Sequence, residues 1–145
     1  MKEYVVDASV AAKWLLPSAG ETHVAQANRL ADLHVQSKTR LKAPDLILSE
    51  LGNILWKAVR RARTSSADAH SSLLHFGALG VDIIPAQDLW TLALQIATAY
   101  GRTFYDSLYV ALALHTNSEL ITADERLANA LASRFPVRWL GAFHE

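Results

Sequence analysis

The sequence contains no cysteine among its 145 residues. This absence excludes disulfides, thiolate metal sites, iron–sulfur clusters and a cysteine nucleophile, and it suits a reducing cytoplasm. An excess of one charge is also missing, because 14 basic and 14 acidic side chains give a formal net charge of zero. Proteins that bind duplex DNA usually have a basic excess. Any contact with nucleic acid therefore has to come from a local patch.

Long apolar runs are absent as well. No uncharged run approaches the ~20 residues that span a bilayer. The first apolar stretch, 4–16, is interrupted by Asp7 and Lys13 and lacks the cleavage site of an export signal. We therefore expect a cytoplasmic protein without a membrane partner. The length fits a single domain, 1–145, and an apolar fraction of 51% is enough for a full hydrophobic core.

Short apolar runs alternate with helical patterns along the chain. We predict strands at 3–7, 41–44, 81–84, 119–122 and 137–140. Helices are predicted at 8–16, 21–35, 45–63, 65–79, 89–100, 104–115 and 124–134, and Pro17 stops the first of them. Apolar strands in such an alternation indicate a parallel sheet covered by helices on both faces, which is a three-layer α/β/α domain.

Four acidic residues lie near the ends of these elements. Asp7 ends the first strand, Asp124 follows the strand that ends at Thr122, and Asp106 falls in the first turn of a predicted helix. Glu50 lies beside the apolar stripe of the long helix 45–63. Ligands bind beyond the carboxyl ends of the strands in sheets of this type. If the first strand and the 119–122 strand are neighbours, ~4.8 Å apart, Asp7 and Asp124 reach one shared ion.

A cluster of carboxylates favours one kind of chemistry. Carboxylates repel one another unless protons or a cation compensate their charge. Ligation by oxygen alone selects a hard ion such as Mg²⁺ or Mn²⁺. Such an ion polarises a phosphoryl oxygen and helps to generate hydroxide from water. The reaction class that follows is hydrolysis of a phosphodiester or phosphate ester.

Each acid also has a purely structural interpretation. Asp7 can cap the helix that begins at residue 8, and Asp106 can complement a helix dipole. The run Thr122-Ala123-Asp124-Glu125 fits a capping box, which leaves Asp124 as an acid of the first helical turn. Glu50 can pair on the helix surface with Lys57 or Asn53. These interpretations stay open on the residue pattern alone.

Four segments resemble the signature blocks of PIN domains, and specifically of VapC-type toxins. They occur in the order of that family and span nearly the whole chain. The blocks are Val5-Val6-Asp7-Ala8-Ser9-Val10 with Lys13-Trp14, Pro44-Asp45-Leu46 with Ser49-Glu50 and Asn53, Tyr105-Asp106-Ser107-Leu108-Tyr109-Val110-Ala111-Leu112-Ala113, and Leu120-Ile121-Thr122-Ala123-Asp124-Glu125-Arg126-Leu127.

The resemblance implies a PIN fold and a Mg²⁺- or Mn²⁺-dependent endoribonuclease. It also implies a homodimer that a cognate antitoxin protein holds inactive. The implied metal ligands and catalytic residues are Asp7, Glu50, Asp106 and Asp124, and the residues implied to orient them are Ser9, Thr122 and, more weakly, Asn53.

The chain departs from the family pattern at one position. Many relatives carry another acid two residues after the fourth one, where this chain has Arg126. We therefore expect one principal ion, bound by Asp7, Asp106 and Asp124, with a weaker second ion near Glu50.

RNA needs positive charge near these acids. Lys57, Arg60 and Arg61 form a basic run near the end of the long helix, and Arg102 precedes the Asp106 helix. These residues are candidates for phosphate contacts, although a cationic helix end is an equally ordinary structure. Three tryptophans within apolar stripes are predicted to be core or dimer contacts rather than base-stacking platforms: Trp14, Trp56 and Trp90.

Other functions are weaker candidates. A haloacid-dehalogenase-like phosphatase needs an acid at the position of Ser9, and a response-regulator receiver needs a late-strand lysine, although no lysine follows Lys57. The main alternative is a PIN-fold scaffold that binds without cleaving. It predicts that binding survives removal of the four acids.

Overall fold

The computed structural model describes residues 1–16 and 21–145, so the predicted helix stop at Pro17 lies outside the described residues. In this part of the chain, five parallel strands form one sheet with the order β3-β2-β1-β4-β5. The strands are β1 (Lys2–Val6), β2 (Thr39–Pro44), β3 (Asp82–Ile84), β4 (Glu119–Thr122) and β5 (Val137–Trp139).

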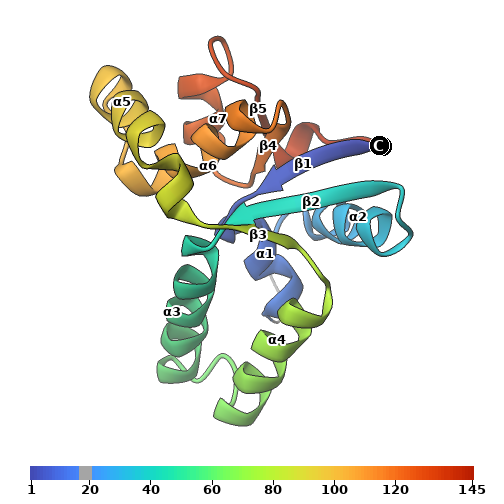
Figure 1. Ribbon diagram of the computed structural model, residues 1–145. Helices are drawn as coiled ribbons and strands as arrows, with labels where there is room; N and C mark the ends of the chain where they lie inside the picture. The colour runs from blue at the N-terminus through green and yellow to red at the C-terminus, as the bar shows by residue number, and fades with distance from the viewer. Residues whose placement is uncertain (17–20) are drawn as a thin grey trace.

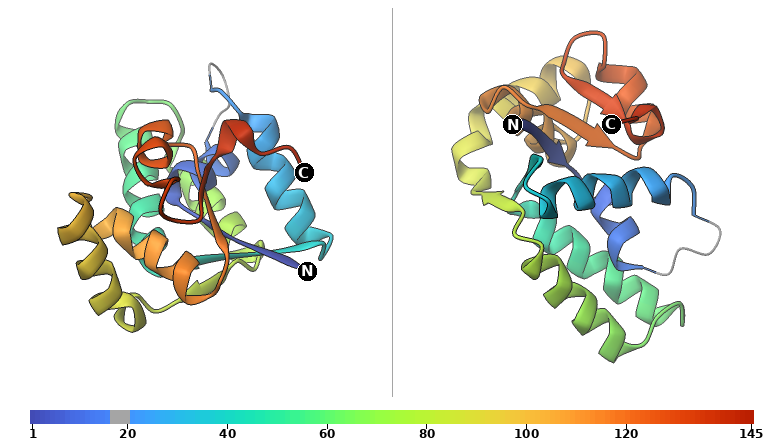
Figure 2. Two further views of the ribbon diagram at one scale, coloured as in Figure 1. Left: turned by 90° about the horizontal axis from the view of Figure 1, so that it is seen from above. Right: turned by 90° about the vertical axis from the view of Figure 1, so that its right-hand side faces the viewer.

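Helices cover both faces of this sheet (Figures 1 and 2). One face carries α1 (Ala8–Leu15), α2 (Val24–Val35), α3 (Leu46–Arg60) and α4 (Ser66–Ala78). The other face carries α5 (Trp90–Tyr100), α6 (Phe104–His115) and α7 (Glu125–Leu131). A short 3-10 turn, η1 (Ala86–Leu89), connects β3 to α5, and a second one, η2 (Leu140–Ala142), follows β5 and contacts α2. The predicted three-layer α/β/α class is therefore confirmed.

The central pair of strands brings two predicted site residues together. Val6 of β1 pairs with Ile121 of β4, so Asp7 and Thr122 follow side by side at the carboxyl edge of the sheet. From β1 the chain builds the sheet to one side through β2 and β3, and it then returns to place β4 and β5 on the other side of β1. The carboxyl edge between β1 and β4 is therefore a topological switch point. Open α/β sheets bind their ligands at such points.

The hydrophobic core surrounds β1 and α6. Val5 and Val6 have 0% exposure, and every α6 residue from 107 to 113 is buried. Because α6 is apolar on nearly all sides, it packs between the sheet and α5. The core thereby fixes the first turn of α6, where Asp106 lies, against the carboxyl edge.

Several predicted boundaries are wrong by a few residues. α2 begins at Val24 rather than at residue 21, and α7 ends at Leu131 rather than at residue 134. α3 ends at Arg60 rather than at residue 63, because Ala62 adopts a left-handed backbone with φ 57° and the Arg63 N–H donates back to the Ala58 carbonyl. This is the hydrogen-bond pattern of a helix C-terminal cap.

Two of the three tryptophans are not core residues. The exposed fractions of Trp56 and Trp90 are 53% and 55%. Trp14 does pack against the core, and its indole N–H donates to the Ala27 carbonyl at 2.7 Å. An apolar stripe on a helix predicts that the stripe is covered by a neighbouring element. On α3 and α5, the part of the stripe that carries Trp56 or Trp90 is exposed instead.

α3 and α4 lie side by side and extend away from the sheet (Figures 1 and 2). Among the described helices, none is long and apolar enough to span a bilayer.

Candidate metal centre

Asp7 is a buried acid at the carboxyl end of β1, with 8% exposure. Its Oδ1 accepts hydrogen bonds from the Ser9 hydroxyl at 2.5 Å and from the Val10 N–H at 3.3 Å. Its Oδ2 accepts from the Thr122 hydroxyl at 2.5 Å. The bond from Val10 makes Asp7 the N-cap of α1, as the structural interpretation predicted. The two hydroxyls go beyond that role, because a cap needs neither of them.

Thr122 and Ser9 connect Asp7 to the segment that carries Asp124. The Thr122 oxygen, which is fully buried, also accepts from the Asp124 N–H at 3.1 Å. The Ser9 oxygen accepts from the Ala123 N–H at 3.0 Å. Both hydroxyls therefore join the ends of β1 and β4.

The capping box proposed for residues 122–125 is wrong. Asp124, not Thr122, is the N-cap of α7, and its Oδ1 accepts from the N–H groups of Arg126 and Leu127 at 3.0 and 3.2 Å. Asp124 is exposed, and its Oδ2 takes no part in the cap. The cap fixes the orientation of the carboxylate and leaves one oxygen for a ligand.

Asp106 lies in the first turn of α6, as predicted. Thr103 caps that helix by accepting from the Asp106 N–H at 3.0 Å. The guanidinium of Arg102 lies 3.7 Å from Asp106 Oδ2, which places this predicted RNA contact inside the acidic centre. The Nε of Arg102 is buried and has no hydrogen-bond partner among the described residues.

Glu50 lies in the second turn of α3 and is half-buried. Its partner is neither Lys57 nor Asn53, because Oε1 accepts a hydrogen bond of 2.5 Å from the hydroxyl of Tyr109 on α6. Asn53, one turn later, is exposed. Tyr109 was not among the site residues predicted from the sequence. Its spacing of three residues from Asp106, which places both on one helical face, was the available signal.

Electrostatic effects link the four acids. Burial raises the pKa of Asp7 from 3.8 to about 6, hydrogen bonds from Ser9, Thr122 and Val10 oppose this shift, and the charge of Glu50 adds to it. Burial also raises the pKa of Glu50, where Tyr109 opposes and the charge of Asp106 adds to the shift. The pKa of Asp106 is likewise raised by burial and by Asp124, against the lowering effect of Arg102 and Thr103.

These interactions join Asp7 to Glu50, Glu50 to Asp106 and Asp106 to Asp124 across the edge of the sheet. Within residues 1–16 and 21–145, no three such side chains are gathered closely enough to coordinate one ion in this conformation. The donors nevertheless fit a hard divalent cation, because they are carboxylate and hydroxyl oxygens whose negative charge burial leaves poorly compensated.

Basic side chains line two further cavities, and in the second of them both cations are paired with Glu21. Lys57, Arg60 and Arg61 are exposed near the end of α3 and line a cavity of about 340 Å³ with Trp56. A second cavity, of about 220 Å³, lies beside Ser9, and Lys13 and Arg63 contribute to its lining.

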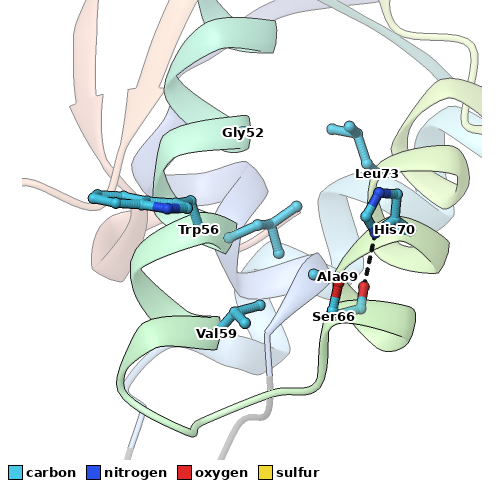
Figure 3. Close-up of a pocket in the computed structure, with 8 residues that line it drawn as sticks. Gly52, Trp56, Val59, Ser66, Ala69, His70 and Leu73 are labelled. Carbon is cyan, nitrogen blue, oxygen red and sulfur yellow. Dashed lines mark hydrogen bonds between the residues drawn. The ribbon is translucent and has the colours of Figure 1, made fainter.

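An apolar groove separates α3 from α4 (Figure 3). It has a volume of about 260 Å³, and none of the four acids is part of its lining. Leu73, at 40% exposure, points from α4 toward α3, whereas the ring of Trp56, at 53% exposure, extends along the outer side of α3, away from α4. The residues that line it are Gly52, Leu55, Trp56, Val59, Ser66, Ala69, His70 and Leu73.

Comparison with known proteins agrees with this geometry. The PIN domain family model matches residues 4–131. The chain is 32% identical to Ribonuclease VapC9 of Mycobacterium tuberculosis, over 92% of this chain and 94% of the relative. It is 35% identical to Ribonuclease VapC3 of Pyrobaculum aerophilum, over 86% of this chain and 91% of the relative.

Solved structures show the same fold. PAE2754 from Pyrobaculum aerophilum superposes with a TM-score of 0.67 at 24% identity, covering 97% of this chain and 92% of that one. VapBC-1 from nontypeable Haemophilus influenzae superposes with a TM-score of 0.63 at 13% identity, covering 96% and 98%. The chain therefore belongs to the PIN-domain family, with VapC ribonucleases as its relatives.

Proposed function

We propose that this protein is a metal-dependent endoribonuclease and the toxin of a toxin–antitoxin pair. Ribonuclease activity follows from its VapC relatives, which are ribonucleases and which the chain matches over nearly their whole length. The observation that carries the proposal for the site is Asp7, a buried carboxylate that two hydroxyls hold at the switch point of the sheet. A buried acid without a cation opposite it is costly, and a site for a cation removes that cost.

Asp7, Glu50, Asp106 and Asp124 are the proposed ligands of Mg²⁺ or Mn²⁺. The bound ion would supply Lewis acidity toward a phosphodiester oxygen and lower the pKa of water. Ser9 and Thr122 orient Asp7 through the hydrogen bonds already described. The cap bonds of Asp124 use Oδ1 alone and leave its second oxygen available for the ion. Asn53 is exposed, one turn from Glu50, and stays a weaker candidate for orienting that acid.

RNA is the proposed substrate, and Arg102 is its nearest cationic contact. Arg102 already lies beside Asp106, and its side chain keeps 27% exposure, so its guanidinium can contact an RNA phosphate. Phosphates farther along the RNA chain would contact Lys57, Arg60 and Arg61. Because single-stranded RNA carries a charge at every nucleotide, these contacts make binding sensitive to salt.

An antitoxin is the proposed inhibitor, supported by likeness to the toxin fold of VapBC-1. The groove between α3 and α4 is a suitable place for one of its segments (Figure 3). Its lining is mostly apolar, and the cavity that shares Trp56 with it is lined by Lys57, Arg60 and Arg61, so an amphipathic helix with acidic side chains would match the two together. Trp56→Glu should abolish co-purification with the co-expressed antitoxin, and unchanged co-purification would place the antitoxin elsewhere.

A homodimer is the proposed oligomeric state, and α5 offers a face for a second copy. Trp90 and Leu94 lie one turn apart with exposures of 55% and 56%. α5 contains no charged side chain, so a twofold contact would not oppose like charges. Light scattering should report a dimer for the wild type and a monomer for Trp90→Lys. A wild-type monomer would contradict this assignment.

A scaffold that binds RNA without cleaving it is the alternative from another class. The direct test incubates purified, partner-free protein with total RNA and Mg²⁺ or Mn²⁺, beside an EDTA control and Asp7→Asn. Cleavage that both controls abolish supports the enzyme. Folded protein that binds RNA equally well with and without Asp7 but cleaves nothing supports the scaffold.

A further inference from the structure

Tyr109 is a buried phenol in the middle of the acidic centre. It lies on α6 with 3% exposure, three residues after Asp106 and on the same helical face. Its hydroxyl donates a hydrogen bond of 2.5 Å to Oε1 of Glu50. Tyr109 therefore joins two of the four acids: Asp106 through its own helix, and Glu50 through its hydroxyl.

The bond between Tyr109 and Glu50 connects the two helical layers. Glu50 belongs to α3 on one face of the sheet, and Tyr109 belongs to α6 on the other (Figure 1). A glutamate has three rotatable side-chain bonds, and holding it in one position costs conformational entropy. Glu50 is only half-buried, so packing alone does not fix its carboxylate. The buried, rigid ring of Tyr109 provides the fixed partner that Glu50 lacks on its own helix.

We propose that Tyr109 is a positioning residue that holds the Glu50 carboxylate at the place where it contributes to binding the divalent cation. The bonded oxygen of Glu50 fixes the plane of the carboxylate, and the other oxygen is left for the ion. This inference rests on the proposed function, because it requires that the four acids bind a cation. Partners of this kind, which touch a ligand and not the metal, typically change metal affinity by 10–100-fold when they are removed.

A structural role is the competing explanation, because the ring of Tyr109 is part of the hydrophobic core. Tyr109→Phe separates the two roles. It keeps the ring and its packing and removes only the oxygen that contacts Glu50. A purely structural tyrosine would change the melting temperature and leave the affinity of the folded protein for metal unchanged.

The experiment measures Mn²⁺ binding in the absence of RNA, by electron paramagnetic resonance of free Mn²⁺. We expect Tyr109→Phe to weaken binding about tenfold. The matched control is Tyr105→Phe on the same helix, because Tyr105 is 61% exposed; its affinity should equal that of the wild type. In a Glu50→Ala background, where the remaining acids still bind, Tyr109→Phe should cause no further loss. This double-mutant cycle assigns the effect to the pair.

Three outcomes decide the matter. Equal Mn²⁺ affinity of Tyr109→Phe and the wild type overturns the inference and leaves the proposed function intact. A tenfold loss that persists in the Glu50→Ala background also overturns it, because Tyr109 would then act through another group. Wild-type protein that binds no Mn²⁺ overturns the proposed metal centre itself, and the inference with it.

Discussion

The hydroxyl of Thr122, at the end of β4, donates a hydrogen bond of 2.5 Å to Oδ2 of Asp7, at the end of β1. The same oxygen accepts from the Asp124 N–H at 3.1 Å. One buried hydroxyl therefore links two proposed ligands that are 117 residues apart in the chain, by the difference of their numbers. The parallel pairing of β1 with β4 makes this contact possible.

Thr122→Val should impair the site more than the fold. Valine has nearly the shape of threonine but lacks the hydroxyl, so Asp7 loses a donor and the Asp124 N–H loses its acceptor. We expect RNA cleavage to fall about 10–100-fold and stability to fall by about 1–3 kcal/mol. Initial cleavage rates and chemical denaturation measure the two effects. Thr98→Val, on exposed α5, is the control, and equal rates for all three proteins would remove Thr122 from the site.

The buried charge of Asp7 should make metal-free protein less stable at neutral pH. The pKa of Asp7 in the fold is about 6, above its ordinary 3.8, so the folded state holds this proton more tightly than the unfolded state. Stability then falls as the pH rises from about 4 to about 6, by at most about 3 kcal/mol, since each pKa unit is about 1.4 kcal/mol. The raised pKa values of Glu50 and Asp106 act in the same direction.

Asp7→Asn isolates this contribution. In EDTA, the free energy of unfolding of Asp7→Asn minus that of the wild type should increase between pH 4 and pH 7. The amide also changes stability by an amount that does not depend on pH, and this amount does not affect the trend. Denaturation curves at several pH values measure this difference. A relative stability that does not change with pH would mean that Asp7 ionises freely in the fold. Added Mn²⁺ should stabilise the wild type at pH 7 and affect Asp7→Asn much less.

Asp124 combines a cap with a proposed ligand, and two substitutions separate these roles. Asparagine caps helices as well as aspartate does, so Asp124→Asn should keep the stability of α7 and lose cleavage. Asp124→Ala should lose cleavage and also about 1 kcal/mol of stability. Thermal melts and cleavage rates of both variants test the prediction. Wild-type cleavage by Asp124→Asn would reduce Asp124 to its structural role.

The basic end of α3 should contribute to RNA binding through charge alone. Reversing Arg60 and Arg61 to glutamate should weaken binding and reduce the slope of log affinity against log salt by about 1.4, since each contact with single-stranded RNA contributes about 0.7. The matched control reverses Lys38 and Arg40, which lie near the start of β2 at the opposite edge of the sheet. An equal salt slope in both variants would remove the α3 run from the interface.

Much of the site follows from the pattern of the strands. Short apolar runs that end in an acid predicted where Asp7 and Asp124 lie, and the pairing of β1 with β4 confirmed the condition on which their proximity depended. These positions could be predicted because parallel strands all end at the same edge of the sheet. The alternation of strands and helices likewise sufficed to predict the three layers.

Contacts between distant helices were beyond such reasoning. The bond between Glu50 and Tyr109 joins residues 59 apart on helices from opposite layers, and no periodicity encodes how two helices are placed relative to each other. The capping box failed for a related reason, because Thr122 has a better partner in Asp7 than in its own helix. Trp56 was predicted to be a core or dimer contact, and its exposure excludes the core, because a helical stripe shows which face is apolar but not how much of it a neighbour covers.

The most direct test of the central claim is cleavage of a circular RNA by the wild type and by four single variants, Asp7→Asn, Glu50→Gln, Asp106→Asn and Asp124→Asn. A circle has no ends, so only an endonuclease linearises it. We predict that the wild type converts the circle to a linear product with Mg²⁺ or Mn²⁺ and not with EDTA, and that each folded variant is at least 100-fold slower. Linear product in EDTA, or wild-type rates for Asp7→Asn and Asp124→Asn, would contradict a four-carboxylate metal centre.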